Sequence, residues 1–320
     1  MNSPVHVCIV NYRSAGYLRA CVESMLLTAV SSITIVDNAS GADERAELHA
    51  VSALDPKISL LLNDTNLGFA GGVNRAVQAS PAGDDDLIWI VNPDTTVSGD
   101  ALDRLAQVLD NDTMDIVSPV IFTGSSSNTT IWYAGGWIDY AKGVTWHDEK
   151  MPQTDLQSIP TGFITGAAPM MRLRTWRQLD GLREEFFLYW EDVEFSARAL
   201  SAGLRLGVVP QAKIWHAQGG SVGTSGGGMS AGYYYYGQRN RILVVRPRVG
   251  LLTILAGSGF RETARLIVKP ALLESAPRLP KLRASIRGIR DGIGGVTGPV
   301  VTDGRTTRRG ALGRGGNASE

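Results

Sequence analysis

The stretch VHVCIVNY at residues 5–12 is an apolar run that ends in two polar side chains. Three more short runs, rich in β-branched and aliphatic residues, follow at residues 33–36, 58–62 and 87–91. Runs of this kind are typical of strands that are buried on both faces. Between the first two, Ser14 is placed to cap a helix with one apolar face, formed by Leu18, Cys21, Val22, Met25 and Leu26. The alternation predicts an α/β fold with right-handed βαβ crossovers and a mostly parallel central sheet.

The composition sets limits on this fold. The chain has 320 residues, of which 43% are hydrophobic, enough for one large α/β domain or a domain with an appendage. The formal net charge is zero, but the segment from Arg239 onward carries 16 Arg and Lys against 5 Asp and Glu. The acidic body before it is suited to metal binding. The basic segment either seeks phosphates or an anionic surface, or is simply a solvated tail.

The two cysteines, Cys8 and Cys21, lie among apolar residues of a predicted strand and a predicted helix, and we expect them to be reduced core residues. The chain does not open with the longer apolar region of a signal peptide. The longest apolar stretch near its end, residues 249–259, is about half of the roughly 20 residues needed to cross a bilayer. We therefore expect a cytosolic protein.

Unusual polar residues collect in the loops that follow the predicted strands. Asn11 and Tyr12 follow the first strand, Asp37 follows the second, and Asn92 and Asp94 follow the fourth. Ligands of parallel sheets bind beyond the carboxyl ends of the strands. One crevice can therefore hold all of these residues.

Asp94 stands on a turn fixed by Pro93, where its carboxylate suits a Mg²⁺ or Mn²⁺ ion. Such hard cations take one or two protein carboxylates and fill their other positions with diphosphate oxygens and water. The alternative is a turn in which Asp94 caps the following helix. Asp37 likewise either accepts a hydrogen bond from a nucleoside or caps the next helix.

The segment NLGFAGGVN at residues 66–74 is rich in glycine. Its glycines, Gly68 among them, permit close approach of the backbone to a ligand, with Asn66 before them and Asn74 on the helix that follows. A tight loop without a ligand is the alternative.

The segment FFLYWEDVEF at residues 186–195 is an aromatic run that ends in acids at a predicted helix start. Carboxylates are common in the first turn of helices. The functional alternative is that aromatic neighbours desolvate one acid and make it a general base in a sugar pocket. Adjacent helical residues point about 100° apart, so Glu191 and Asp192 do not serve the same proton, and we favour Asp192.

Two further side chains are candidates for binding. His216 precedes a Gly/Ser-rich stretch; a lone histidine is commonly structural, but a neutral imidazole can also complete a metal site with Asp94. Arg239 follows the four tyrosines at residues 233–236 and either clamps a diphosphate through bidentate hydrogen bonds or merely begins the basic segment.

Several classes of protein lack support. The first strand is not followed by G-x-G-x-x-G, which disfavours a nicotinamide dehydrogenase, and no G-x-x-x-x-G-K-[ST] occurs, which disfavours P-loop phosphoryl transfer. The basic segment has no aromatic stacking pattern, so we expect no specific nucleic-acid partner. A sugar nucleotidyltransferase and a non-catalytic glycan-binding or scaffold subunit stay open as alternatives.

Taken together, the segments resemble glycosyltransferase family 2, in particular its bacterial rhamnosyltransferase-like members that build cell-envelope glycans. The resemblance covers about residues 5–240. It rests on IVNY at 9–12, VDNAS at 36–40, NLGFA at 66–70, NPD at 92–94, Gly166-Ala167, residues 186–192 and His216. It implies a GT-A fold, in which a Rossmann-like nucleotide-binding half joins an acceptor half, and an inverting mechanism.

The resemblance also implies roles for single residues. Asp37 contacts the nucleoside, Asp94 and His216 hold Mg²⁺ or Mn²⁺, and Asp192 is the base, at a helix N-terminus that lowers its pKa. The family's metal motif is often Asp-any-Asp, whereas Asn92 stands in place of the first acid here. Further candidates for donor binding are Asn11, Tyr12, Asn66, Gly68, Asn74, Asn92 and Arg239.

The implied substrates are a nucleotide-sugar donor, with dTDP-rhamnose preferred and UDP-sugars next, and a glycan acceptor. Related enzymes commonly use acceptors carried on polyprenyl diphosphates. Apolar residues of the basic segment could lie in the inner face of the cell membrane and meet them, namely Leu251, Leu252, Ile254, Leu255, Leu266 and Ile267. The protein would then be peripheral on an anionic membrane surface.

These expectations divide the chain into three parts. Residues 1–240 form the GT-A glycosyltransferase domain, with residues 1–118 as the nucleotide-sugar half and residues 119–240 as the acceptor half. Residues 241–290 form a basic amphipathic helical extension. Residues 291–320, rich in Gly, Thr and Arg, are expected to be a disordered tail.

Overall fold

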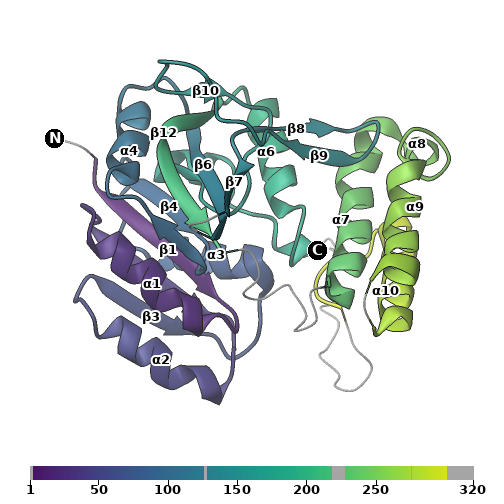
Figure 1. Cartoon of the computed structure of the whole chain (residues 1–320), viewed down its shortest axis with the longest axis horizontal. Coiled ribbons are helices and arrows are strands. Elements are labelled where there is room, and N and C mark those ends of the chain that lie inside the picture. Colours follow the sequence, from purple (N-terminus) through teal and green to yellow (C-terminus); the bar gives the residue numbers. More distant parts are fainter. Residues whose placement is uncertain (1–2, 126–127, 218–227, 275, 301–320) are drawn as a thin grey trace, which may run out of the picture.

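The computed structural model describes residues 3–125, 128–217, 228–274 and 276–300. Within these residues a ten-stranded mixed sheet has the order β10-β12-β6-β11-β4-β1-β2-β3, with β5 added to β12 and β7 to β6 (Figure 1). The strands are β1 (Val5–Asn11), β2 (Ser32–Asp37), β3 (Ile58–Leu62), β4 (Leu87–Val91), β5 (Thr95–Val97), β6 (Ile116–Ser125), β7 (Asn128–Tyr133), β10 (Ile159–Pro160), β11 (Met170–Arg172) and β12 (Leu206–His216).

The N-terminal half has the predicted parallel arrangement. β1 pairs in parallel with β2 and with β4, and β2 pairs in parallel with β3. The four predicted strands are confirmed, although the edge strand β3 is only partly buried. The helices are α1 (Ala15–Leu26), α2 (Ala42–Ser52), α3 (Gly68–Ala79) and α4 (Ala101–Asp110). Ser14 stands before α1 as predicted, but its hydroxyl donates to the Tyr12 carbonyl oxygen and caps no N–H of the helix.

The second half of the sheet brings distant segments together. β11 lies antiparallel between β4 and β6, and β12 runs parallel to β6 with an irregularity between Val209 and Lys213. The end of β12 also pairs antiparallel with β5, which places His216 opposite Thr95. The topology therefore delivers His216 to the loop after β4.

Three small elements complete the acceptor half. The hairpin of β8 (Gly136–Asp139) and β9 (Val144–His147) forms a separate two-stranded sheet that reaches toward the C-terminal helices (Figure 1). The helix α5 (Leu173–Gln178) and the short helix η1 (Glu184–Phe186) lead to α6 (Glu191–Ser201), which begins at the predicted residue.

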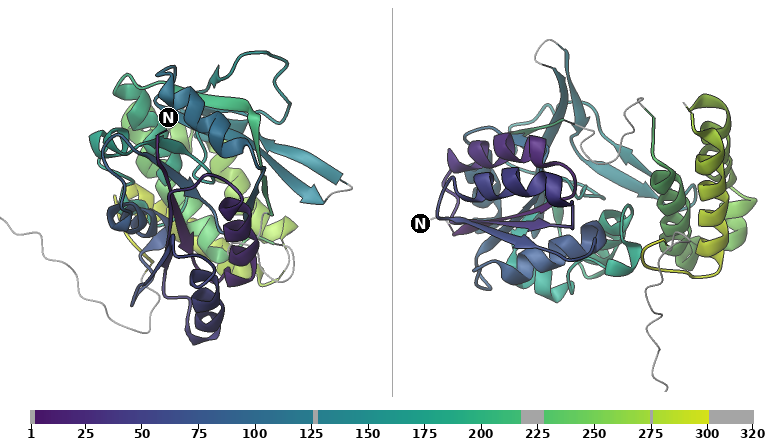
Figure 2. Two further views of the ribbon diagram at one scale, coloured as in Figure 1. Left: turned by 90° about the vertical axis from the view of Figure 1, so that its left-hand side faces the viewer. Right: turned by 90° about the horizontal axis from the view of Figure 1, so that it is seen from below.

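The C-terminal helices stand beside the sheet as a separate bundle (Figure 2). They are α7 (Ala231–Val249), α8 (Leu251–Leu255), α9 (Phe260–Val268), the π-helical turn η2 (Lys269–Leu273) and α10 (Arg278–Ile293). α10 packs closely on α7 at two glycines: a Cβ at Gly288 would lie 2.4 Å from the Tyr235 carbonyl oxygen, and one at Gly292 would lie 3.0 Å from that of Arg239. Only glycine permits this approach.

The predicted divisions fall inside these helices. The boundary between residues 240 and 241 lies within α7, and that between 290 and 291 lies within α10. Residues 294–300 return to the body, where the Gly298 N–H donates to the Glu185 carbonyl oxygen at 2.7 Å and the Val300 N–H donates to the Tyr236 hydroxyl at 2.9 Å. The first ten residues of the expected disordered tail are therefore folded, which corrects its start; residues 301–320 lie outside the described residues.

The core lies on both faces of the sheet. One cluster joins β1, β2, α1 and α4, and a second packs α3, α5 and α6 against the opposite face. Fully burying one such aliphatic side chain contributes roughly 1.5–3 kcal/mol. Cys8 and Cys21 are buried and unpaired, as predicted, and burial raises the pKa of each thiol to about 12. In the part of the chain that the structure describes, no helix has the length and apolar character to span a bilayer.

Candidate active site

A cavity of about 1470 Å³ opens beyond the carboxyl ends of the parallel strands. Tyr12 follows β1 and Asp94 follows β4 at its edge, as the strand pattern predicts. Asp192 from the start of α6 and His216 from the end of β12 also line it. The cavity therefore gathers the two predicted metal ligands and the predicted base from three segments that are far apart in the sequence.

Asp94 and His216 face each other across a short distance in the cavity. Their side chains are nearly buried, and Oδ1 of Asp94 lies 2.9 Å from Nε2 of His216. The amide of Asn92 lies 3.2 Å from the same Nε2. A backbone hydrogen bond from the Ala217 N–H to the Asp94 carbonyl oxygen, 2.9 Å, holds the two segments together.

The residues fit a divalent cation. Two ligands on one ion at the usual distances of about 2.1 Å sit roughly 3 Å apart, as these two atoms do. Nδ1 of His216 is buried without a hydrogen-bond partner among the described residues, so no protein acceptor fixes the tautomer of the ring, and Nε2 is the nitrogen that faces Asp94. No cluster of three or more His, Cys, Asp or Glu ligands occurs in the described ranges.

Asp192 occupies the first turn of α6. Its Oδ2 accepts a hydrogen bond from the Gly166 N–H at 3.0 Å, and its Oδ1 accepts one from the Val193 N–H at 2.8 Å. Each oxygen keeps a free lone pair for another proton. Burial raises the pKa of Asp192 and outweighs the backbone hydrogen bonds, which lower it. The helix N-terminus lowers this pKa as expected, but the net shift is upward because burial has the larger effect.

Glu191, the neighbouring acid, is buried and also lines the cavity. Burial, with the charge of Asp192 beside it, raises the pKa of Glu191 to about 8. Glu191 is therefore mainly neutral at pH 7. Burial is the main cause of the raised pKa in both acids of this coupled pair.

The loop before α6, which presents Asp192, has a strained backbone. Phe187, Tyr189 and Trp190 all have left-handed backbone angles, with φ of 64°, 65° and 70°. Such angles cost non-glycine residues of the order of 1 kcal/mol each and collect at functional sites. The buried Asn240 amide holds this loop, because its Nδ2 donates to the carbonyl oxygens of Phe186, Leu188 and Tyr189 at 2.7–2.9 Å.

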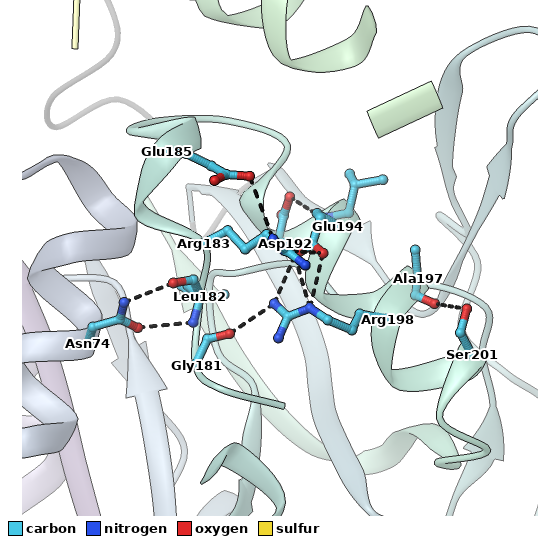
Figure 3. A network of polar contacts seen from close by, with 11 residues as sticks. Asn74, Gly181, Leu182, Arg183, Glu185, Asp192, Glu194, Ala197, Arg198 and Ser201 are labelled. Atoms are coloured by element: carbon cyan, nitrogen blue, oxygen red, sulfur yellow. Dashed lines mark hydrogen bonds and ion pairs between the residues drawn. The ribbon is translucent and has the colours of Figure 1, made fainter. Parts of the chain in front are cut away.

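Asn74 contributes to the same loop from α3. Its side chain makes two hydrogen bonds to the backbone of Leu182, at 2.8 and 3.0 Å (Figure 3). Glu194 on α6 binds Arg183 at 2.9 Å and Arg198 at 2.8 Å in the same network. Asn74 does not line the cavity. It stabilises the segment that presents Asp192. Its position does not support the prediction that it binds the donor.

The glycine-rich loop borders the cavity through Asn66 and Gly68. Oδ1 of Asn66 accepts the Gly68 N–H at 2.8 Å, and Nδ2 of Asn38 donates to the Gly68 carbonyl oxygen at 2.7 Å. Gly68 has a φ of +76°, and a Cβ there would lie 2.2 Å from the Phe187 carbonyl oxygen. Glycine is therefore required for the loop to meet the strained segment before α6.

Asn11 and Asp37 lie at neighbouring strand ends but not at the cavity surface. Nδ2 of Asn11 lies 2.9 Å from Oδ1 of Asp37, which also accepts the Ser40 hydroxyl, and 3.0 Å from Glu44. Both predicted side chains are buried and bound to other protein groups. The structure places them behind the donor side of the cavity.

Arg239 is placed differently from the prediction. Its guanidinium is fully buried and donates to the carbonyl oxygens of Glu185, Phe186 and Gly298. It does not line the cavity, so it is not positioned to clamp a diphosphate. Its role is to tie α7 to the loop before α6.

The cavity wall is instead lined by cationic residues that come after Arg239 in the sequence. Arg241, Arg265 and Lys269 lie there, with Glu262 and Glu274 among them. Arg265 pairs with Glu262 at 2.6 Å, and Lys269 lies 3.8 Å from Glu274. Nε and Nη1 of the buried Arg241 guanidinium have no partner among the described residues. Helical periodicity could have separated Arg241 from Arg239, because residues two apart face different directions.

His147 is a cavity residue that the sequence did not single out. It stacks on Phe163 at 5.8 Å between ring centroids and lies edge-on to Trp132 at 4.9 Å. Burial lowers its pKa, against a smaller opposing effect of the Asp192 charge. No local motif marks it, because its neighbours in the cavity come from other segments.

The fold is that of GT-A glycosyltransferases. Over 92% of its length the chain matches a crystal structure of GalNAc-T7 with UDP, GalNAc and Mn²⁺, with a TM-score of 0.63 and 13% identity, covering 56% of that chain. It matches Staphylococcus aureus TarS (residues 1–349, complex with UDP) with a TM-score of 0.53 and 13% identity, over 92% of this chain and 83% of that one.

Residues 6–176 match the family Glycosyl transferase family 2, and the chain belongs to that family. It is 24% identical to the N-acetylglucosaminyl-diphospho-decaprenol L-rhamnosyltransferase of Mycobacterium tuberculosis, over 70% of this chain and 79% of that protein. It is also 24% identical to the dTDP-rhamnosyl transferase RfbF of Shigella flexneri, over 93% and 98%. The chain is thus a glycosyltransferase with rhamnosyltransferase-like relatives.

Proposed function

We propose that the protein is an inverting, metal-dependent glycosyltransferase that moves rhamnose from dTDP-rhamnose to a hydroxyl of a cell-envelope glycan. The observation that carries the proposal is that the Asp94–His216 pair and the buried carboxyl group of Asp192 line one cavity. The names of the Mycobacterium tuberculosis and Shigella flexneri relatives support rhamnose as the transferred sugar.

Asp94 and His216 would hold Mg²⁺ or Mn²⁺ at the donor end of the cavity. The Mn²⁺ in the GalNAc-T7 structure supports the use of a divalent ion. The bound ion supplies neutralising charge for the departing nucleoside diphosphate. Tyr12, Asn66 and Gly68 also line the cavity, which supports their assignment to the nucleotide.

Asp192 acts as the general base. It takes the proton of the acceptor hydroxyl while that oxygen attacks the anomeric carbon and the bond to the diphosphate oxygen breaks. A single displacement of this kind inverts the anomeric configuration. A buried carboxylate with a raised pKa is a stronger base than an exposed one.

The acceptor carries a polyprenyl diphosphate in this proposal. The name of the Mycobacterium tuberculosis relative gives its substrate as a sugar on diphospho-decaprenol, which supports this class. The cavity wall with Arg241, two of whose three guanidinium nitrogens have no partner in the described part of the chain, is chemically suited to a diphosphate.

Membrane contact is part of the same proposal. Leu252, Leu272, Leu273 and Leu279 are exposed on the C-terminal bundle, and Arg278 and Arg283 are exposed near them in sequence. Such a combination favours an anionic bilayer surface. Of the residues expected to enter the interface, Ile254 and Leu266 are instead buried within the bundle, because their helices use that face to pack on their neighbours.

The test is release of nucleoside diphosphate from dTDP-, UDP- and GDP-sugars, with N-acetylglucosaminyl diphosphate on a short polyprenyl chain as the acceptor. We expect Mg²⁺- or Mn²⁺-dependent release from dTDP-rhamnose, reduced at least about 100-fold by Asp94→Asn. Asp100→Asn, an exposed carboxylate outside the cavity, is the matched control and should behave like wild type. Metal-independent release, or release of pyrophosphate from a nucleoside triphosphate, would overturn the proposal.

A further inference from the structure

Two tryptophans are exposed side by side on the β8–β9 hairpin. Trp137 is 53% exposed and Trp146 is 56% exposed, and they are directly opposite each other in the antiparallel ladder. Residues paired in this way project from the same face of a hairpin. Large exposed aromatic side chains in a contiguous patch mark a binding surface more often than isolated ones do.

The pair continues the wall of the catalytic cavity. Trp146 lines the cavity, as do the neighbouring Thr145 and His147, whereas Trp137 lies outside it. Trp137 packs beside Gly162, where an added Cβ would lie 3.0 Å from its ring. The two indoles therefore form a strip that begins inside the cavity and leads out of it.

The hairpin that carries them is fixed at both ends. At its base, the Gly136 N–H donates to Thr161 Oγ1 at 2.8 Å, and the Gly162 N–H donates to the Gly136 carbonyl oxygen at 3.0 Å. At its tip, the Ser258 hydroxyl donates to the Ala141 carbonyl oxygen at 2.6 Å. The strip is therefore a preorganised surface, which reduces the entropy lost when a ligand binds.

The chemistry around the strip favours a sugar over a lipid. The exposed aliphatic side chains of the chain's second half lie mainly on the C-terminal bundle, whereas the hairpin's Ile138 and Val144 are half-buried. Asp148 and Glu149, both exposed, follow Trp146 closely and would repel an anionic bilayer. A flat indole with polar neighbours matches a sugar ring, which has one face of C–H groups and a rim of hydroxyls.

We propose that Trp146 and Trp137 form a stacking platform for the glycan of the acceptor. Trp146 stacks on the sugar nearest the reacting hydroxyl, and Trp137 stacks on the next sugar outward. This inference rests on the proposed function, because it assumes that the cavity accepts a glycan. It adds a specificity site that selects acceptors by the sugars they present.

Kinetics with the short-chain acceptor test the platform. Trp146→Ala should raise the acceptor KM about tenfold while the donor KM and kcat at saturating acceptor stay near wild type. Trp146→Phe should recover part of the loss. Tyr17→Ala removes an exposed aromatic residue outside the cavity and is the matched control. Trp137→Ala should weaken binding of an acceptor with two sugars, chitobiosyl diphosphate on the same lipid, more than it weakens binding of the acceptor with one sugar.

A binding measurement separates this inference from the proposed function. In saturation-transfer NMR with the same two acceptors, wild type should saturate the ring C–H protons of the sugars, and Trp146→Ala should lose most of that signal. If no donor is turned over, the proposed function fails while the NMR result still decides the platform. An unchanged acceptor KM and NMR signal in Trp146→Ala, or a loss confined to binding of anionic vesicles, would overturn it.

Discussion

The replacement Asp192→Asn is the sharpest test of the catalytic assignment, because it removes the base and keeps the shape. We expect kcat to fall by about 10²–10⁴-fold, the usual contribution of a general base. Asparagine has one acceptor oxygen, so it can satisfy either the Gly166 N–H or the Val193 N–H but not both. The lost hydrogen bond costs about 1–3 kcal/mol of stability, which is offset in part because a buried charge is removed.

The matched control is Glu191→Gln, which changes the adjacent buried acid. Because Glu191 is mainly neutral at pH 7, the amide keeps its charge state, and we expect a kcat close to that of wild type. The assay is nucleoside diphosphate release at saturating donor and acceptor, with donor affinity measured by calorimetry and expected to change little in either variant. If Asp192→Asn kept more than about a tenth of the wild-type kcat, the reasoning would be refuted.

Four further results are expected. The acid limb of the pH profile of kcat/KM should lie above the ordinary Asp pKa of about 3.9, because burial raises the pKa of Asp192 and the base is lost as the pH falls through it. Stability from protonated Glu191 should be lost as the pH rises from about 4.5 to about 8, so the melting temperature of Glu191→Gln should depend less on pH across that window. Gly68→Ala should lower the free energy of unfolding by about 2–4 kcal/mol in urea titration, because its Cβ would overlap the Phe187 carbonyl oxygen. Arg239→Met should cost about 3 kcal/mol in the same assay, because it leaves buried carbonyl groups unpaired.

The sequence predicts the N-terminal half well because its signals are local. Each buried strand is a continuous apolar run, and each run ends in polar residues at the same edge of a parallel sheet. Asp94 and Tyr12 therefore lie at the cavity as expected. The convergence of His216 on Asp94 depends on the pairing of β12 with β5, which no local pattern contains.

The remaining errors concern direction and environment. The direction in which a helical side chain points depends on what packs against the helix. Arg239 is therefore buried against the loop before α6, whereas Arg241 lines the cavity wall. Asn74 sits in a glycine-rich segment, as a ligand-binding residue would, but its amide binds the Leu182 backbone. The pKa of Asp192 depends on the surroundings of α6, which the helix position alone does not reveal. Burial in the assembled cavity outweighs the effect of the helix end.

Helix α7 has a consequence for how the protein can be divided. Its buried polar run of Gln238, Arg239, Asn240 and Arg241 binds the loop before the base on one side and the C-terminal bundle on the other. The bundle is therefore not an interchangeable module that could be deleted or grafted onto a relative. Calorimetry should show one cooperative transition for the whole chain, and a truncation after residue 241 should unfold the catalytic half together with the part that it removes.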